Sequence, residues 1–340
     1  MRYQLKDICN PKQWKTIQTS EMKPTGYPVY GSNGIIGYYD QYNHKQPTIL
    51  VTCRGATCGR VNICREYSYV TGNAMALDDL ASFVNINYLC YLLQFDGLQS
   101  VISGTAQPQI VRNVLERFWV EIPDINTQSM IVSRLEKLET IIGIYQSELE
   151  ELDKLVKSRF VEIFGDPVSN EKGLSIKLGK DIFKLSNGKF VPEEKRLDIG
   201  VPVYGGNGIS WYTDTNLLEK ATIVVGRVGF HSGNVHYAQG PLWVSDNAMY
   251  ISELLDEDYD LCFLYYLMDI IDFTRFQDAG DLKKITQKPF MEMEFICPSK
   301  QKQHCFLDIV HQIDKSKSVI QRSLDEAQLL FDSLMQEYFG

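Results

Sequence analysis

Three cysteines lie close together in the chain, at Cys53, Cys58 and Cys64, and thiolates at such short spacing are candidate ligands for a metal ion. His231 and His236 form a second candidate pair. The paired spacing Cys-x-x-Cys, which is typical of zinc sites, occurs nowhere in the sequence. Both candidates can be tested within the chain itself, because one long passage occurs twice.

The repeated passage reads YPVYGSNGIIGYYD at residues 27–40 and VPVYGGNGISWYTD at residues 201–214. Between residues 28–77 and 202–251 the offset is constant at 174, and 19 of 50 positions are identical. Further along the chain the offset becomes 175. It then pairs Ile110 with Ile285, Pro123 with Pro298 and Gln128 with Gln303. We infer that the chain is a tandem duplication.

The duplication argues against both metal candidates. The second copy replaces the three cysteines by other residue types, Arg227, Ser232 and Ala238. The partners of the two histidines are also of other types, Thr57 and Asn62. We therefore predict no metal site and interpret the thiols as small buried residues.

Sequence signatures of catalysis are absent as well. The chain has no phosphate loop, no His-Glu-x-x-His, no Gly-x-Ser-x-Gly and no kinase set. It also lacks the Asn/Asp-Pro-Pro-aromatic passage of amino-methyltransferases. The glycines around residue 34 resemble a cofactor loop, but Gly37 becomes Trp211 in the second copy. We predict no catalytic residue and no cofactor in this chain.

Size and charge limit the partners. A length of 340 residues is sufficient for two globular cores. The net charge is −9 and no segment is strongly basic, so a role on nucleic acid would require a few local cations and a partner protein. No run approaches 18 apolar residues and the first residues do not resemble a signal peptide. We expect a soluble cytoplasmic protein.

Each copy is predicted to be a β-rich domain followed by one long helix, an α+β fold. Asn33-Gly34 and its second copy indicate a hairpin with a type I′ turn. The β-branched runs at residues 48–52 and 222–226 predict buried strands. Short amphipathic helices are expected at NYLCYLLQF and LCFLYYLMDII, and a last strand at FWVEIP and MEFICP.

The long helices carry a narrow apolar seam with four-three spacing, which is typical of a coiled coil. In the first copy the seam is Ile131, Leu135, Leu138, Ile142, Tyr145, Leu149, Leu152 and Val156. In the second copy it is Phe306, Val310, Ile313, Lys317, Ile320, Leu324, Ala327 and Phe331. Lys317 interrupts the second seam and could fix its register. A helix laid on its own domain is the alternative, but the length of the seam favours pairing of the two helices.

The predicted organisation is two pseudo-symmetric β-rich domains separated by two long helices packed as an antiparallel coiled coil. The boundaries are 1–125 for the first β-rich domain and 126–170 for the central helix. They are 171–300 for the second β-rich domain and 301–340 for the C-terminal helix. A helix over residues 128–164 would be a rod of roughly 55 Å.

These residues resemble the specificity subunit of type I restriction–modification systems. The resemblance covers essentially the whole chain. It rests on PVYGSNGIIGYYD and PVYGGNGISWYTD, on EIPDINTQSMIVSRLEKL and ICPSKQKQHCFLDIVHQI at the helix starts, and on FVEIFGDP at the first helix end. The second helix start departs slightly, with Phe306 where the first has Ile131.

The resemblance implies two target-recognition domains, each reading one half of a bipartite, non-palindromic site on double-stranded DNA. It implies that the helices set the spacing and dock two methyltransferase subunits. Those partners would bind S-adenosylmethionine and methylate adenine, and restriction subunits could join them. The specificity subunit would not itself be an enzyme.

Because the two domains should read different half-sites, the unmatched polar residues of matched loops are the better DNA-contact candidates. In the first copy they are Ser32, Arg54, Thr57, Arg60, Gln107 and Gln109. In the second copy they are Arg227, His231, Asn234, His236, Lys283 and Lys284. The matched pairs Asn33/Asn207 and Asn73/Asn247 are also candidates, although a cap or turn role is favoured for them.

Two other functions compete with DNA recognition. The first is a two-headed scaffold that binds proteins or glycans through its β-rich domains. The second is an enzyme with Cys53 or Cys58 as nucleophile, which is disfavoured because no paired histidine accompanies either thiol in the repeat.

Overall fold

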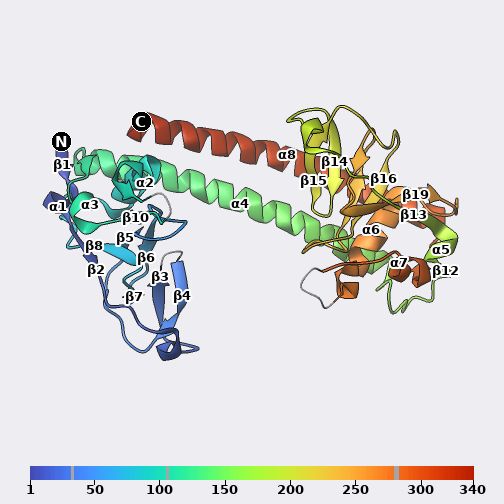
Figure 1. Cartoon of the computed structure of the whole chain (residues 1–340), viewed down its shortest axis with the longest axis horizontal. Coiled ribbons are helices and arrows are strands. Elements are labelled where there is room, and N and C mark those ends of the chain that lie inside the picture. Colours follow the sequence, from blue (N-terminus) through green and yellow to red (C-terminus); the bar gives the residue numbers. More distant parts are fainter. Residues whose placement is uncertain (32–33, 105–106, 279–282) are drawn as a thin grey trace. The chain divides into compact units, whose positions relative to one another are not determined.

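The computed structural model describes residues 1–31, 34–104, 107–278 and 283–340. The chain forms two compact units. Unit 1 comprises Met1–Gln146 and Arg322–Gly340, and unit 2 comprises Ser147–Gln321. Two continuous helices of 40 residues, α4 (Ile125–Phe164) and α8 (Lys300–Phe339), each contribute one part to each unit (Figure 1).

Unit 1 is built on a four-stranded sheet of order β2-β8-β5-β6 and a three-stranded sheet of order β4-β3-β7. The first contains β2 (Asn10–Gln13), β5 (Thr48–Thr52), β6 (Val61–Cys64) and β8 (Ala74–Asp78). The second contains β3 (Tyr27–Gly31), β4 (Gly34–Tyr39) and β7 (Tyr69–Val70). Two short pairs join β1 (Arg2–Gln4) to β11 (Trp119–Glu121) and β9 (Ile102–Ser103) to β10 (Gln109–Ile110). All pairs are antiparallel except β3 with β7.

One helix of unit 1 covers the four-stranded sheet. It is α2 (Ile86–Asp96), whose N-terminus is capped by the Asn85 side chain and whose end is marked by Gly97 at φ +67°. The other helices are short: α1 (Leu5–Ile8), η1 (Thr19–Glu21), η2 (Gln99–Val101) and α3 (Arg112–Leu115).

Unit 2 repeats this plan, with sheets of order β13-β19-β16-β17 and β15-β14-β18 and the pair β12-β20. The four-stranded sheet contains β13 (Phe183–Asn187), β16 (Thr222–Gly226), β17 (Val235–Ala238) and β19 (Ala248–Leu254). The others are β12 (Ile176–Leu178), β14 (Val201–Gly205), β15 (Gly208–Thr213), β18 (Trp243–Val244) and β20 (Glu294–Ile296). The helices are α5 (Gly179–Ile182), η3 (Glu193–Lys195), α6 (Leu261–Ile271), η4 (Phe273–Phe276) and α7 (Lys288–Glu292).

The register of the sheets follows the duplication. Gln13 pairs with Met75 in unit 1, and Asn187 pairs with Met249 in unit 2, which keeps the offset of 174 on both strands. The equivalence therefore extends upstream of the passage in which the sequence identity is evident. Residues of the two units can be compared position by position from the first sheet strand onward.

The predicted hairpin is present in unit 2, but its turn differs from the predicted type I′ turn. Gly205 pairs with Gly208, so the two turn residues are Gly206 and Asn207 rather than Asn207 and Gly208. Positive φ occurs at Gly208, at +86°, and at neither turn residue. A register shift of one residue separates the Val203–Trp211 pair from the Tyr204–Ile209 pair in the same hairpin. In unit 1 the predicted turn residue Asn33 lies outside the described residues.

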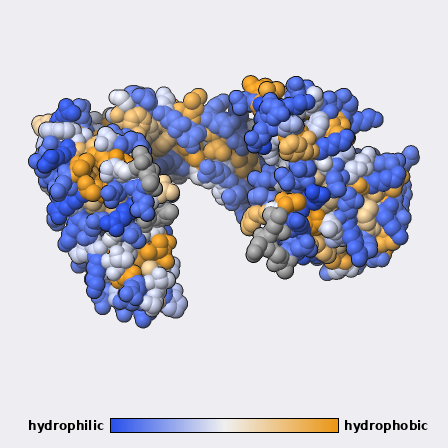
Figure 2. Space-filling model, viewed as in Figure 1, coloured by the Kyte–Doolittle hydropathy of each residue, from blue (hydrophilic) through white to orange (hydrophobic). Residues whose placement is uncertain are grey.

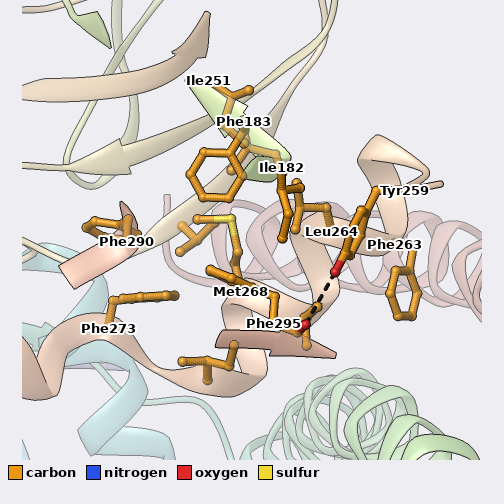
Figure 3. Close-up of a cluster of buried hydrophobic side chains, with 14 of the residues drawn as sticks. Ile182, Phe183, Ile251, Tyr259, Phe263, Leu264, Met268, Phe273, Phe290 and Phe295 are labelled. Atoms are coloured by element: carbon orange, nitrogen blue, oxygen red, sulfur yellow. Dashed lines mark hydrogen bonds between the residues drawn. The ribbon is translucent and has the colours of Figure 1, made fainter. Parts of the chain in front are cut away.

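The core of unit 2 lies between its four-stranded sheet and α6. Figure 3 shows side chains from several elements converging there, among them Phe183 of β13, Met268 of α6 and Phe295 of β20. Phe273 stacks on Phe290 with ring centroids 4.1 Å apart. The equivalent cluster in unit 1 contains Tyr88, Leu89 and Leu93 of α2. Each unit thus has its own hydrophobic core.

The long helices pack against one another within both units. In unit 1, Arg134 Nη1 of α4 donates to the hydroxyl of Tyr338 of α8 at 2.8 Å. In unit 2, Lys317 of α8 pairs with Asp153 of α4 at 2.6 Å, and Phe160 contacts Phe306 at 5.3 Å between ring centroids. As the residue number increases along α4, the number of the contacting residue on α8 decreases, so the two helices pack antiparallel. All sixteen predicted seam residues are buried or half-buried.

The predicted fold class is confirmed: two tandem α+β units are combined with two long antiparallel helices. The central helix begins at Ile125, one residue before the predicted boundary at 126 and three before the stretch 128–164 used for the rod. Asp124 explains the earlier start, because its carboxylate accepts hydrogen bonds from the amides of Asn126 and Thr127. Within the described residues no helix is long and apolar enough to cross a membrane.

A buried glutamine ties each long helix to the short helix of the same unit. Gln303, fully buried, accepts from the amide of Asp260 at 2.9 Å and donates to the carbonyls of Asp258 and Pro298. Gln128 makes the equivalent three bonds with Asn85, Phe83 and Pro123. The matched glutamines are therefore structural.

Replacing Gln303 by leucine should destabilise unit 2 by about 2–4 kcal/mol, because three buried backbone groups lose their partner. The measurement is hydrogen exchange at the first amides of α6, which should open more readily. The substitution Gln301→Leu on the exposed face of the same helix is the matched control and should change little. Equal exchange in both variants would show that these bonds do not stabilise the unit.

Candidate nucleic-acid interface

In each unit three segments that are distant in sequence meet beside the four-stranded sheet. In unit 1 they are the loop after β5, the turn before β8 and residues 107–110. Three backbone hydrogen bonds join them: Ile110 N to Cys53 O at 3.0 Å, Gly55 N to Pro108 O at 3.2 Å, and Cys53 N to Asn73 O at 3.3 Å. Unit 2 has the same bonds: Ile285 N to Arg227 O at 3.0 Å, Gly229 N to Lys283 O at 2.8 Å, and Arg227 N to Asn247 O at 2.9 Å.

The loops after β5 and β16 share one backbone conformation that depends on glycine. Gly55 and Gly59 have φ of +88° and +91°, and Gly229 and Gly233 have φ of +93° and +92°. A Cβ at Gly59 would lie 2.9 Å from the carbonyl oxygen of Gly97. The matched glycines therefore form the scaffold, and the side chains between them are free to differ.

Unit 1 presents most of its candidates at the surface. Arg54, Arg60, Asn73, Gln107 and Gln109 are exposed, and Thr57 is half-buried. The structure brings Arg54 and Gln109 together, since they form an antiparallel β-bridge. Ser32 and Asn33 lie outside the described residues.

Seven of the eight candidates in unit 2 line three cavities. The largest, of about 540 Å³, is lined in part by Asn207, His231 and Asn247. The next, of about 390 Å³, is lined by Arg227 and Lys284. Val228 lines both cavities, so these five candidates lie around the loop after β16 that contains Val228.

Two further candidates face another cavity, and the last, Lys283, is exposed beside Phe230. Asn234 and His236 line a space of about 260 Å³. His236 Nε2 lies 3.2 Å from the carbonyl oxygen of Gly206. Among the described residues, the Nε atom of Arg227 is buried and has no hydrogen-bond partner.

Other residues that line the cavity of about 540 Å³ were not predicted from the sequence, among them Phe190, Arg196, Trp211 and Phe230. Phe190 and Phe230 are 68% and 77% exposed. Comparison of the copies could have identified Trp211 and Phe230, because they replace Gly37 and Ala56. The predicted DNA contacts were restricted to polar residues, so these two aromatic residues were not among them.

The structure offers no support for a cysteine nucleophile. Burial raises the pKa of the Cys53 and Cys58 thiols, so little reactive thiolate forms near neutral pH. Among the described residues no three His, Cys, Asp or Glu side chains come together in a way that could hold a metal ion.

The sequence of this chain is similar to those of known proteins of one family. The family model described as "Type I restriction modification DNA specificity domain" matches residues 1–154 and again 175–328. The chain is 30% identical over 115 residues to the type I restriction enzyme EcoprrI specificity subunit of Escherichia coli, over 34% of this chain and 28% of that protein. It is 24% identical over 362 aligned positions to the putative type I specificity subunit S.MgeORF438P of Mycoplasma genitalium, over 96% and 90% of the two chains.

Solved structures share the fold. The crystal structure of a type I restriction–modification S subunit from Mycoplasma genitalium matches all of this chain and 96% of that chain, with a TM-score of 0.65 and 19% identity. A chain from work on complex assembly and conformational transition of the type I system matches all of this chain and 97% of that chain, at 0.58 and 11%. Two family matches that together span most of the chain decide its membership. The chain belongs to the type I restriction–modification DNA specificity subunits, which recognise DNA and are not themselves catalytic.

Proposed function

We propose that this chain reads a bipartite, non-palindromic site on double-stranded DNA, one half with each unit, and docks two methyltransferase subunits. Through them it would recruit restriction subunits. The S-adenosylmethionine would be bound by the methyltransferase partners, and the assembly would work in the cytoplasm.

One observation carries the proposal: the two units share a scaffold and differ in the side chains mounted on it. The same three hydrogen bonds join the same three segments in both units. At equivalent positions of those segments, unit 1 has Arg54 and Gln109 whereas unit 2 has Val228 and Lys284. Side chains that differ on a constant scaffold are what two different half-sites require.

Exposed apolar residues on the long helices support docking of partner proteins. Ile144, Leu329 and Leu330 of unit 1 are 51%, 72% and 50% exposed. Val319 of unit 2 is 65% exposed. Figure 2 shows apolar side chains gathered along these helices within a mainly hydrophilic surface. Such residues outside the seam are available for contact with another helix or subunit.

We predict that the chain alone binds DNA weakly and that its complex with the methyltransferase subunit binds a bipartite site at least a hundredfold more tightly. The physical reason is the net charge of −9, which leaves the lone chain without a strong field for phosphates. Gel-shift titrations of both forms at matched salt test this prediction. Tight sequence-specific binding by the lone chain would contradict the need for a partner.

The same titration separates DNA recognition from the alternative of a protein- or glycan-binding scaffold. A scaffold of that kind would show no preference between the selected duplex and a scrambled duplex, with or without the methyltransferase subunit. The proposed reader would prefer the selected duplex in the complex.

A further inference from the structure

The cavity of about 540 Å³ in unit 2 has aromatic walls that come from three separate segments. Phe190 follows β13, Trp211 lies on β15, and Phe230 lies in the loop after β16. Phe190 and Phe230 are 68% and 77% exposed, so neither ring is part of the core. A volume of about 540 Å³ is within the range of pockets that hold small organic groups.

The backbone holds these rings in place. The carbonyl oxygen of Phe230 accepts from the Gln277 side chain at 3.3 Å, and the amide of the preceding Gly229 donates to Lys283 O. Beside Phe190, the amide of Lys189 donates to Val244 O at 2.8 Å. The exposed rings are therefore carried by hydrogen-bonded segments rather than by free loops.

A cation lies over each of two rings. The guanidinium of Arg196 is 5.0 Å from the centre of the Trp211 ring, and Lys283 Nζ is 5.2 Å from that of Phe230. Arg196 also pairs with Glu193 at 3.4 Å, on the exposed surface. Cations beside aromatic faces are suited to a ligand that combines a flat ring with phosphates.

The polar lining complements the edge of a base. Asn207, Asn247 and Asp246 all line the cavity and are exposed to it. An amide can pair with adenine through one donor and one acceptor, and a carboxylate can accept from an exocyclic amino group. The cavity thus offers ring faces for stacking and polar groups for the ring edge.

Unit 1 lacks these walls. Its residues at the positions of Phe190, Arg196, Trp211, Phe230 and Lys283 are Thr16, Met22, Gly37, Ala56 and Pro108. Met22 occupies the space beside Gly37, since a Cβ there would lie 2.7 Å from its sulfur. The same two positions are neighbours in both units. Unit 1 has Met22 beside Gly37, whereas unit 2 has Arg196 beside Trp211.

We propose that this pocket of unit 2 receives a single nucleobase displaced from the duplex, so that unit 2 reads part of its half-site by stacking. This proposal rests on the proposed function. Stacked bases in a duplex present only their edges to a protein, whereas ring walls around a cavity contact the faces of an unstacked base. Unit 1, with no such walls, reads its half-site from base edges alone.

The test is a mismatch scan with the full chain in complex with its methyltransferase subunit. The probes are duplexes of the site obtained by selection, each with one mismatched pair. A mismatch at a pair read by its edges weakens binding, by about 5- to 150-fold. A mismatch at the displaced base should instead tighten binding by about tenfold, because the pair is already broken.

The variant is Phe230→Ala combined with Trp211→Gly, which gives unit 2 the residues that unit 1 carries at these positions and should therefore be compatible with the fold. A methyltransferase subunit displaces the base that it methylates, so mismatches at the methylated positions should tighten binding with both chains. Apart from those positions, we expect one position of one half-site to show tightening with the unmodified chain and none with the variant. Met22→Ala in unit 1 is the matched control and should leave the pattern unchanged.

Two results would overturn the inference: no tightening outside the methylated positions, or such tightening that survives in the folded variant. Either one leaves the proposed function intact if the complex still prefers the selected duplex to a scrambled one. Loss of that preference in the unmodified complex would count against the proposed function itself.

Discussion

Inserting four residues into each long helix is expected to lengthen the spacer between the two DNA half-sites by one or two base pairs. One helical turn adds about 5.4 Å, and B-DNA advances about 3.4 Å per base pair. The half-sites themselves should not change, because the insertion does not touch either set of loops. The measurement is the methylated motif before and after insertion.

The insertion belongs between Ile142 and Leu149 of α4, matched near Lys317 of α8. Both helices are continuous there, and the seam residues in this stretch are half-buried rather than fully buried. Four residues are not a heptad, so the seam will be locally underwound but should remain paired. The ion pair of Lys317 with Asp153 is half-exposed and is expected to contribute less than about 1 kcal/mol.

A seven-residue insertion at the same places is the control, because it preserves the heptad pattern while adding about 10 Å to each helix. It should lengthen the spacer by about three base pairs. An unchanged spacer in both folded, active variants would show that helix length does not set the distance between half-sites.

Exchanging one loop between the units is expected to change one half-site and leave the other untouched. The exchange places residues 228–234 of unit 2 at positions 54–60 of unit 1. Binding to the original first half should fall by about 10- to 100-fold, since each altered base contact is worth about 1–3 kcal/mol. The methylated motif reports both halves at once.

The structure indicates that the exchanged loop will keep its conformation. In unit 1 the amides of Thr52 and Gly59 close the loop, donating to Arg60 O at 2.8 Å and Thr52 O at 2.9 Å. In unit 2 those of Gly226 and Gly233 donate to Asn234 O at 2.9 Å and Gly226 O at 2.8 Å. The reciprocal exchange is the matched control and should alter the other half. A motif in which both halves change together would contradict separate reading.

Much of the fold could be predicted from the sequence because the duplication allows equivalent residues of the two copies to be compared. The seam on α4 and α8 was predictable because a buried helix face requires apolar side chains at regular spacing, and this spacing is visible in the sequence. The matched Gln128 and Gln303 were visible as a pair, but their role was not. Their partners, such as the Asn85 and Asp260 amides, are backbone groups that no residue type reveals.

The candidate site was less predictable. The hairpin turn was misassigned by one residue, because the strand register that places Gly205 opposite Gly208 cannot be told from residue types. The contact of Arg54 with Gln109 depends on how segments distant in sequence are placed together. The aromatic walls at Trp211 and Phe230 were missed because apolar residues are usually interpreted as core, and only the structure shows that Phe230 is exposed.

Selection of duplexes from a random library by the complex of this chain with its methyltransferase subunit tests the central claim most directly. We predict that the enriched sequences contain two short specified blocks separated by an unspecified spacer of fixed length. The two blocks should not be related by two-fold symmetry, because the side chains of the two units differ. Enrichment of one continuous block, of a palindrome or of no sequence at all would contradict the account.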